Sequence, residues 1–191
     1  MRMILETDRL ILRGWEDSDA ASLFKYASDS RIGLSAGWLP HADIKYSRAV
    51  IRAILSREET YAICLKGNAN EPIGNIGLNL KGSPKRPLLQ GEAELGFWVG
   101  HPYWGRGIAP EAVKEILRHG FFDLGLKRVY CGYFKGNDNS KKVQQKCGFK
   151  FHHIENETYI IMLDETRVEY INVITNNEFL LFHKKDTLFN E

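Results

Sequence analysis

The stretch HPYWGRGIAPEA, residues 101–112, sets two glycines one residue apart between a strand-like run and a helix-like run. The run before it is EAELGFWVG (92–100), and the run after it, EAVKEILRHGFF (111–122), repeats apolar residues at the spacing of a core-facing helix. Pro110 is favoured at a first helical position, so the helix is expected to open there. A loop without side chains at a helix N-terminus presents unpaired N–H groups and the positive end of the helix dipole. The sequence therefore predicts an anion site suited to phosphate.

Two familiar phosphate loops do not fit this stretch. The Walker A pattern requires Lys followed by Ser or Thr after its second glycine, where this chain has Ile108 and Ala109. The dinucleotide pattern GxGxxG requires a third glycine where Pro110 stands. Taken alone, the two glycines and the proline are explained equally well by a tight turn into a helix.

Composition limits the class of protein. A chain of 191 residues is expected to form one domain, 1–191. With 26 basic and 24 acidic residues the net charge is +2, so nucleic acid is not an expected partner. No apolar run approaches the roughly 18 residues of a membrane span, and the N-terminus lacks the apolar region of a signal peptide, so we expect a cytoplasmic protein without a membrane partner. The three scattered cysteines, Cys64, Cys131 and Cys147, are expected to be buried thiols, and no metal site is expected.

Periodicity predicts a mixed order of elements. Strands are expected at 9–13, 60–66, 72–80, 92–100 and 128–134, and helices at 15–27, 45–56, 111–122 and 139–147. The N-cap of the first helix is expected at Asp17 or Ser18, residues 37–41 are expected in a turn-rich passage, and KGSPKR (81–86) is expected to be a solvated connection. After residue 150 two or three strands are expected, most clearly at 166–174 and 178–184. The prediction is an α/β (α+β) fold whose mixed, mostly antiparallel central sheet carries helices on both faces.

A second cassette, NDNSKKVQQKCGF (137–149), follows the glycine loop by about thirty residues. Together with TDRLILRGWEDSDAASLF (7–24), the two motifs resemble the GNAT superfamily of acyl-CoA-dependent N-acyltransferases, and in particular its RimJ/RimL-like branch of ribosomal-protein-alanine N-acetyltransferases. The resemblance covers about the first 150 residues. In the family's loop pattern Gly107 and Ala109 take the small positions, and Trp104 stands where many relatives have Gln or Arg. The second motif is matched by Asn137, Ser140, Val143, Gly148 and Phe149.

The resemblance implies acetyl-CoA as co-substrate and assigns it contacts. The loop residues implied are Gly105, Arg106, Gly107, Ile108 and Ala109, and the strand residues, on a strand that splays from its neighbour, are Phe97, Trp98 and Val99. Asn137 would hydrogen-bond the pantetheine amides, and Ser140 would donate to the leaving thiolate. The alternative for Asn137 and Ser140 is N-capping of the short helix that follows them.

The acceptor must be a neutral amine before it attacks. At pH 7, deprotonation costs roughly 4.6 kcal/mol for a lysine and about 1 kcal/mol for an α-amino group, which favours a protein or peptide N-terminal α-amine. Glu94 is the first candidate base, because alternation places it on the strand face of Glu92, Gly96 and Trp98. Glu92, Glu155, Glu157 and water are the other candidates.

The predicted activity is therefore acetyl transfer from acetyl-CoA by direct amine attack in a ternary complex. Two alternatives stay open: a small-molecule acceptor such as a polyamine, aminoglycoside or amino acid, and a non-catalytic acyl-CoA-binding regulatory protein. The segment after residue 150 is expected to line the acceptor groove or to pair with a second copy in a homodimer.

Overall fold

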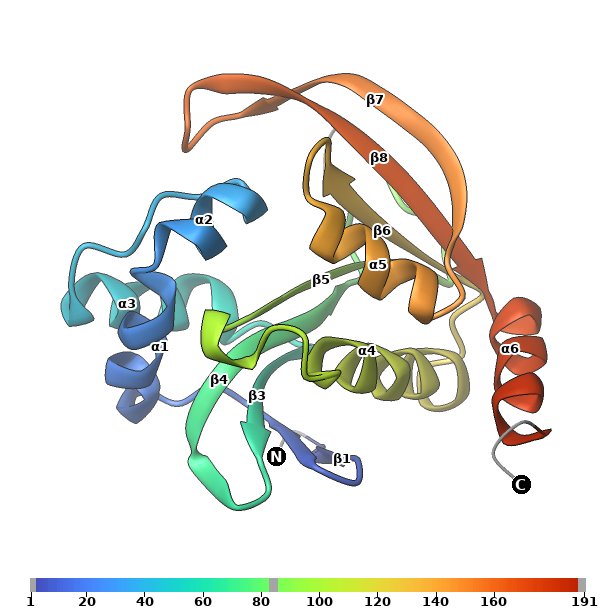
Figure 1. Cartoon of the computed structure of the whole chain (residues 1–191), viewed down its shortest axis with the longest axis horizontal. Helices are drawn as coiled ribbons and strands as arrows, with labels where there is room; N and C mark the ends of the chain where they lie inside the picture. Colours follow the sequence, from blue (N-terminus) through green and yellow to red (C-terminus); the bar gives the residue numbers. More distant parts are fainter. Residues whose placement is uncertain (1–2, 83–85, 189–191) are drawn as a thin grey trace.

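An eight-stranded sheet in the order β1-β2-β3-β4-β5-β6-β8-β7 organises the molecule (Figure 1). The computed structural model describes residues 3–82 and 86–188, with the backbone alone over 183–188. The strands are β1 (Leu5–Glu6), β2 (Leu10–Arg13), β3 (Thr60–Leu65), β4 (Asn68–Asn79), β5 (Glu92–Val99), β6 (Arg128–Phe134), β7 (Lys150–Ile160) and β8 (Glu165–Thr175). The helices are α1 (Ala20–Ala27), α2 (Ser30–Ala36), α3 (Ile44–Val50), α4 (Ile108–Arg118), α5 (Asp138–Lys146) and α6 (Asn176–Leu188). Strands β3, β4 and β5 follow one another without an intervening helix and pair antiparallel as a meander, and β2 pairs antiparallel with β3.

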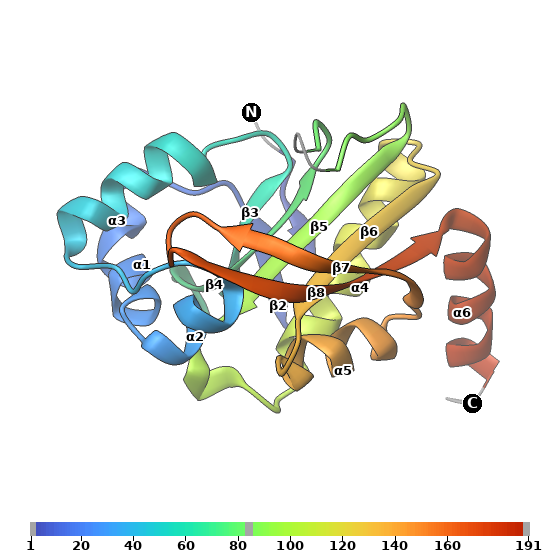
Figure 2. The same cartoon turned by 90° about the horizontal axis from the view of Figure 1, so that it is seen from above.

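The predicted fold class is confirmed, since helices cover both faces of a mostly antiparallel sheet (Figures 1 and 2). On one face the apolar stripe of α4, with Val113 and Ile116 fully buried, packs into the larger core cluster. On the other face α1 and the turn after α3 bury Leu23, Ala27 and Leu55 in a second cluster. Each helix removes one apolar stripe from water, which is the main favourable term in folding.

Two helix starts differ from the sequence prediction. A 3-10 turn, Asp17–Asp19, precedes α1, and its N-cap is Glu16 rather than Asp17 or Ser18. The Asp19 carboxylate accepts from the backbone N–H of Glu16 at 2.8 Å, which fixes the turn one residue earlier. Helix α4 begins at Ile108, so Pro110 lies inside the first turn rather than at its first position.

Helix α2 was not predicted, because residues 30–36 carry a glycine and no clear apolar stripe. Its ends are nevertheless defined: the Asp29 carboxylate accepts from the N–H of Arg31, and Gly37, with φ +88°, ends the helix in the left-handed conformation. The expected turn-rich passage at 37–41 follows it.

The strand predicted at 178–184 is wrong, because this segment lies in α6. Glu178 N–H donates to Thr175 Oγ1 at 3.3 Å, and Thr175 N–H donates to Glu178 Oε2 at 3.0 Å, a reciprocal capping box that opens the helix. Phe179 is then buried against Phe121. The T-x-x-E spacing was the sequence signal for this helix.

Three smaller expectations concern single residues and loops. The cysteines are free and buried, as predicted. Residues 83–85 of the basic connection lie outside the described part of the chain. Arg86, the last residue of this connection, was expected to be solvated, but its side chain is only 13% exposed. Among the described residues, no helix is long and apolar enough to cross a membrane, and no group of three or more His, Cys, Asp or Glu is placed to hold a metal ion.

Candidate active site

Strands β5 and β6 separate in the middle of the sheet. Their parallel pairing joins Glu92–Glu94 to Arg128–Tyr130 and goes no further in the described residues, although β5 runs on to Val99. The backbone groups of β5 that face β6 beyond Glu94 are therefore open to another partner. The end of β5 is held by the Trp104 indole, which donates to the Val99 carbonyl at 2.7 Å. The predicted divergence of this strand from its neighbour is confirmed.

The glycine loop needs its glycines for conformation rather than for space. Gly105 and Gly107 have φ of +74° and +77°, in the left-handed region that side chains disfavour. A Cβ added at Gly105 would meet nothing within 4 Å. The loop leads directly into α4, with Gly107 as its N-cap, so the first N–H groups of the helix point out of its N-terminus.

Arg9 fastens this loop to the N-terminal strands. Its guanidinium donates to the Arg106 carbonyl at 3.1 Å and to the Glu111 carboxylate at 2.7 Å. The other Glu111 oxygen accepts from Thr7 Oγ1 at 2.5 Å and from the backbone N–H of Arg9 at 3.0 Å. Residues 7–24 contributed to the family resemblance, but no local pattern connects Arg9 with a loop about 100 positions away.

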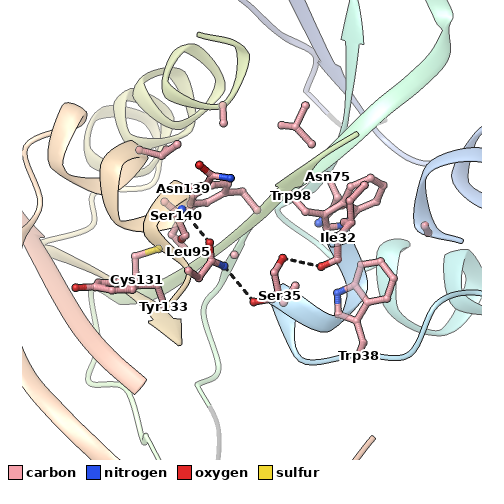
Figure 3. A pocket seen from close by; sticks show the side chains of 18 of the residues that line it. Ile32, Ser35, Trp38, Asn75, Leu95, Trp98, Cys131, Tyr133, Asn139 and Ser140 are labelled. Atoms are coloured by element: carbon pink, nitrogen blue, oxygen red, sulfur yellow. Dashed lines mark hydrogen bonds between the residues drawn. The ribbon is translucent and has the colours of Figure 1, made fainter. Parts of the chain in front are cut away.

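A cavity of about 610 Å³ lies over the gap between β5 and β6 (Figure 3). It falls in the size range typical of small-molecule sites. All the sequence-predicted site residues except Arg106 line it. These are Glu94, Phe97, Trp98, Val99, Gly105, Gly107, Ile108, Ala109, Asn137 and Ser140. Arg106 instead places its guanidinium over the Tyr103 ring, 5.8 Å from the centroid.

Asn137 is the N-cap of α5, and Ser140 lies in the first turn of that helix. Figure 3 shows Ser140 on one side of the cavity. The Asn137 amide oxygen accepts from Ser140 N–H at 3.1 Å, so the capping role weighed for this residue is present. The Asn137 amide nitrogen donates to the Ser35 carbonyl of α2 at 3.0 Å. The cap thereby ties α5 to the opposite side of the cavity.

Gln144, which sequence reasoning missed, fixes the hydroxyl of Ser140. It is fully buried, and its amide nitrogen donates to Ser140 Oγ and to the Gly132 carbonyl, both at 3.2 Å. Its amide oxygen accepts from Asn172 at 2.8 Å, which sets the orientation of the amide. Since Ser140 Oγ accepts this bond, its own proton is left for another acceptor.

Three carboxylates gather around Arg86 on the sheet face that bears Glu94. The Arg86 guanidinium bonds Glu94 and, at 2.8 Å, Glu155, and it lies 3.7 Å from Glu169. Glu169, which lines the cavity, lies over β6 where Gly132 leaves room, because a Cβ on that glycine would clash with the Glu169 carboxylate. Glu169 was not among the predicted bases, because its neighbours come from three distant segments.

One guanidinium does not neutralise three carboxylates. Burial raises the pKa of Glu94 and of Glu169, and the charge of Arg86 offsets this only in part. Burial opposes the shift at Glu155, but the hydrogen bond and charge of Arg86 hold the pKa of that carboxyl below its ordinary value. The cluster therefore contains two cavity-lining carboxyl groups with a raised affinity for a proton.

The remaining candidate bases lie elsewhere. Glu92 is buried, and its carboxylate accepts from the backbone N–H of Leu89 at 3.1 Å. Glu157 is exposed on β7. Neither is among the described residues that line the cavity, and neither is Glu155, which is linked to the lining residue Glu94 through Arg86.

Three features meet at this cavity: two parallel strands that separate, a glycine loop in the left-handed conformation at a helix N-terminus, and Ser140 in the first turn of α5. Together they define an acyl-CoA-dependent acyltransferase site. Comparison with known proteins agrees. Residues 9–150 match the model of the acetyltransferase (GNAT) domain family. The chain is 32% identical over 151 residues to the uncharacterized N-acetyltransferase p20 of Bacillus licheniformis, covering 76% of this chain and 82% of that protein. The chain belongs to the GNAT family, whose members are acetyl-CoA-dependent N-acetyltransferases.

Two solved structures share the fold at lower identity. A GNAT-family acetyltransferase from Bacillus anthracis matches with a TM-score of 0.78 and 22% identity, over 92% of this chain and 99% of that chain. RimJ from Mycobacterium smegmatis, in complex with CoA-disulfide, matches with a TM-score of 0.71 and 21% identity, over 88% and 83% of the two chains.

Proposed function

We propose that this protein transfers the acetyl group of acetyl-CoA to a primary amine, in particular a protein or peptide N-terminal α-amine, by direct attack in a ternary complex. The observation that carries the proposal is one continuous cavity whose lining includes the glycine loop, Ser140 and the carboxylates of Glu94 and Glu169. A cofactor held at the glycine loop, a proton donor at Ser140 and a base at Glu94 or Glu169 would share this cavity, as proximity catalysis requires.

The residues on one side of the cavity fit acetyl-CoA. The N–H groups at the start of α4 suit the pyrophosphate, and the open backbone of β5 at Phe97 to Val99 suits the pantetheine arm. Lys142 and Lys146 of α5 also line the cavity and supply positive charge. Asn137 retains one amide hydrogen beyond its bond to Ser35, which we assign to a pantetheine carbonyl.

The transfer forms a C–N bond between the amine nitrogen and the acetyl carbon as the C–S bond breaks. The proton on the attacking nitrogen passes to a base, and the departing sulfur takes a proton or hydrogen bond from Ser140. We assign the base to Glu94, directly or through a water, with Glu169 as its alternative. A raised pKa makes the Glu94 carboxylate a stronger base. Its pKa is still closer to that of an α-amine than to that of a lysine, so the α-amine is the better-matched acceptor.

Three finer assignments belong to this proposal. We place the chain in the RimJ/RimL-like branch, for which the Trp104 loop and the likeness in fold to RimJ are the support. We extend the domain to 1–191. Strand β8 lies past the family match, yet it pairs with all seven residues of β6. A cytoplasmic location is supported by three free, buried thiols.

Thermal unfolding with acetyl-CoA tests the cofactor, with ATP and NADH as controls. Ligand at roughly 100 times its dissociation constant stabilises the native state by about 2.7 kcal/mol, which raises the midpoint by several degrees. A shift for acetyl-CoA alone, followed by acetylation of peptide N-termini, supports the proposal. Binding without turnover across a panel of amines would instead favour a non-catalytic acyl-CoA-binding protein.

A further inference from the structure

The half of the cavity away from Ser140 is built by α1 to α3 and by the β4 and β5 residues that face them. We call this part the acceptor half. Its lining includes Trp38, Leu39, His41, Tyr46, Ile54 and Trp98. Figure 3 shows Trp38 and Trp98 across the cavity from Ser140. Apart from the histidine these side chains are large and uncharged.

The aromatic rings of the acceptor half form a connected series. The Trp38 ring lies 6.1 Å from Trp98 at 63° and 5.4 Å from His41, and His41 lies 5.0 Å from Tyr46 at 86°. These centroid distances are those of edge-to-face packing. The series presents a wide apolar surface next to the sheet.

The backbone around Trp38 is shaped to hold its indole. A Cβ on Gly33 would lie 2.8 Å from Trp38 Cε3 and 2.7 Å from the Trp38 carbonyl oxygen, so a larger residue would displace the ring. Trp38 N–H donates to the Gly33 carbonyl at 3.0 Å. The tryptophan is thus fixed by the helix it folds back on.

The segment that builds most of this half, residues 20–55, contributes no carboxylate to the lining. Among the described residues that line the whole cavity, the carboxylates are Glu94 and Glu169, and both face Arg86. The lysines of the lining, Lys142 and Lys146, lie on α5, on the cofactor side. A second ammonium group on an acceptor would be desolvated against aromatic and aliphatic side chains without a carboxylate partner, which is costly.

The polar groups that remain are neutral. Ser47 Oγ donates to the Asp43 carbonyl at 3.1 Å, so it accepts from His41 Nδ1–H at 2.9 Å, and His41 Nε2 is left as an acceptor. Burial lowers the pKa of His41, which favours the uncharged ring. Asn75 accepts from the Trp15 indole at 2.9 Å, which leaves its amide nitrogen as a donor. The His41 Nε2 acceptor and the Asn75 amide donor together complement a neutral amide.

We infer that the acceptor is a primary amine with a bulky aromatic or aliphatic substituent and no second positive charge, such as the α-amine of a peptide that begins with Phe or Leu. This inference rests on the proposed acetyltransferase function. Polyamines and aminoglycosides, whose further ammonium groups need carboxylate partners, are poor substrates.

The test compares amidated dipeptides that differ in one side chain. Phe-Gly, Leu-Gly and Lys-Gly amides, with spermidine as a polyamine, are assayed for acetylated product by mass spectrometry and for CoA thiol release. The expected result is a kcat/KM for the Phe and Leu peptides at least about tenfold above those for the Lys peptide and spermidine. Equal or better use of spermidine or the Lys peptide overturns the inference while leaving the acetyltransferase function intact.

Two variants locate the preference. Trp38→Ala is expected to raise KM for the Phe peptide several-fold without changing the dissociation constant of acetyl-CoA, whereas Phe122→Ala, at an exposed aromatic outside the cavity, changes neither. Leu39→Glu, at a half-exposed lining position, is expected to improve use of the Lys peptide. An unchanged preference in both lining variants would contradict the assignment of the acceptor half.

Calorimetric titration of each peptide into the CoA-bound protein measures the same preference without turnover. Tighter binding of the Phe peptide than of the Lys peptide supports the inference even if no peptide is acetylated, in which case the proposed function alone fails. Equal binding, or binding of neither peptide, overturns the inference.

Discussion

The Gln144 amide nitrogen lies 3.2 Å from Ser140 Oγ and donates to it, while the amide oxygen of the same side chain accepts from Asn172. One lone pair of the Ser140 hydroxyl is therefore occupied by a buried residue one helical turn away. The hydroxyl proton is available to an acceptor in the cavity that Ser140 lines.

We predict that Ser140→Ala lowers kcat roughly 100-fold, because the departing thiolate loses its donor. Gln144→Glu lowers kcat as well, because a carboxylate at this position accepts the Ser140 proton instead of donating to its oxygen. Both effects are measured by steady-state kinetics, with the dissociation constant of acetyl-CoA and the unfolding midpoint as controls. If Gln144 acts through Ser140, the double variant Ser140→Ala/Gln144→Glu has the same kcat as the single variant Ser140→Ala. A further fall in the double variant would mean that Gln144 has only a structural role.

Glu94→Gln is predicted to lower kcat/KM about 100-fold, with the largest loss in a defined pH window. Below the pKa of the carboxyl, which burial raises above its usual 4.5, the parent enzyme also lacks its base. Above the pKa of an α-amine, about 7.8, the acceptor needs none. The loss should therefore be greatest between these values. Glu169→Gln is the matched variant, and if it alone removes the acid limb of the pH–rate profile, the base is Glu169. Unchanged profiles in both variants would point to water.

Gly107→Val is predicted to weaken acetyl-CoA binding by roughly tenfold. A branched side chain at φ +77° costs about 1–2 kcal/mol, and the loop leaves this conformation to avoid the cost. The measurement is the thermal shift with acetyl-CoA, and the control is Gly67→Val, at a glycine with open space around it. An unaltered affinity in Gly107→Val would contradict the loop assignment.

Arg9→Ala is predicted to weaken acetyl-CoA several-fold with little change in the unfolding midpoint. The side chain is half exposed, so it contributes little to stability, but it holds the Arg106 carbonyl and the Glu111 carboxylate in the glycine loop and the first turn of α4. Arg52→Ala, which removes an exposed ion pair with Asp17 elsewhere, serves as the control and should leave the affinity unchanged. The same affinity for the cofactor in both variants would remove Arg9 from the site.

The parts of the site that were predictable from sequence carry local signals. Gly105, Gly107 and the β5 residues beside them share one strand–loop–helix unit, and Asn137 and Ser140 lie within one short motif. Three neighbours of the site, Arg9, Arg86 and Glu169, carry no such signal. The Arg9–Glu111 and Arg86–Glu155 contacts cross 102 and 69 positions of sequence, and the place of Glu169 depends on the missing side chain at Gly132.

The errors in the secondary structure predicted from sequence have the same physical origin. Residues 178–184 are apolar enough to be read as a strand, and only the capping box of Thr175 and Glu178 distinguishes a helix. Helix α2 has seven residues, too few to be stable alone, so its existence depends on packing that no local pattern reports.

The last carbonyls of α2 are held from the far side of the cavity. Leu34 O accepts from Arg167 of the β7–β8 hairpin at 2.6 Å, and Ser35 O accepts from Asn137. Figure 1 shows that hairpin arching beyond β6 toward α2. The family match ends at residue 150, yet the hairpin beyond it anchors the helix that leads into Trp38 and, through Asn172, orients the Gln144 amide beside Ser140. The shape of the cavity on both sides therefore depends on residues outside the family match.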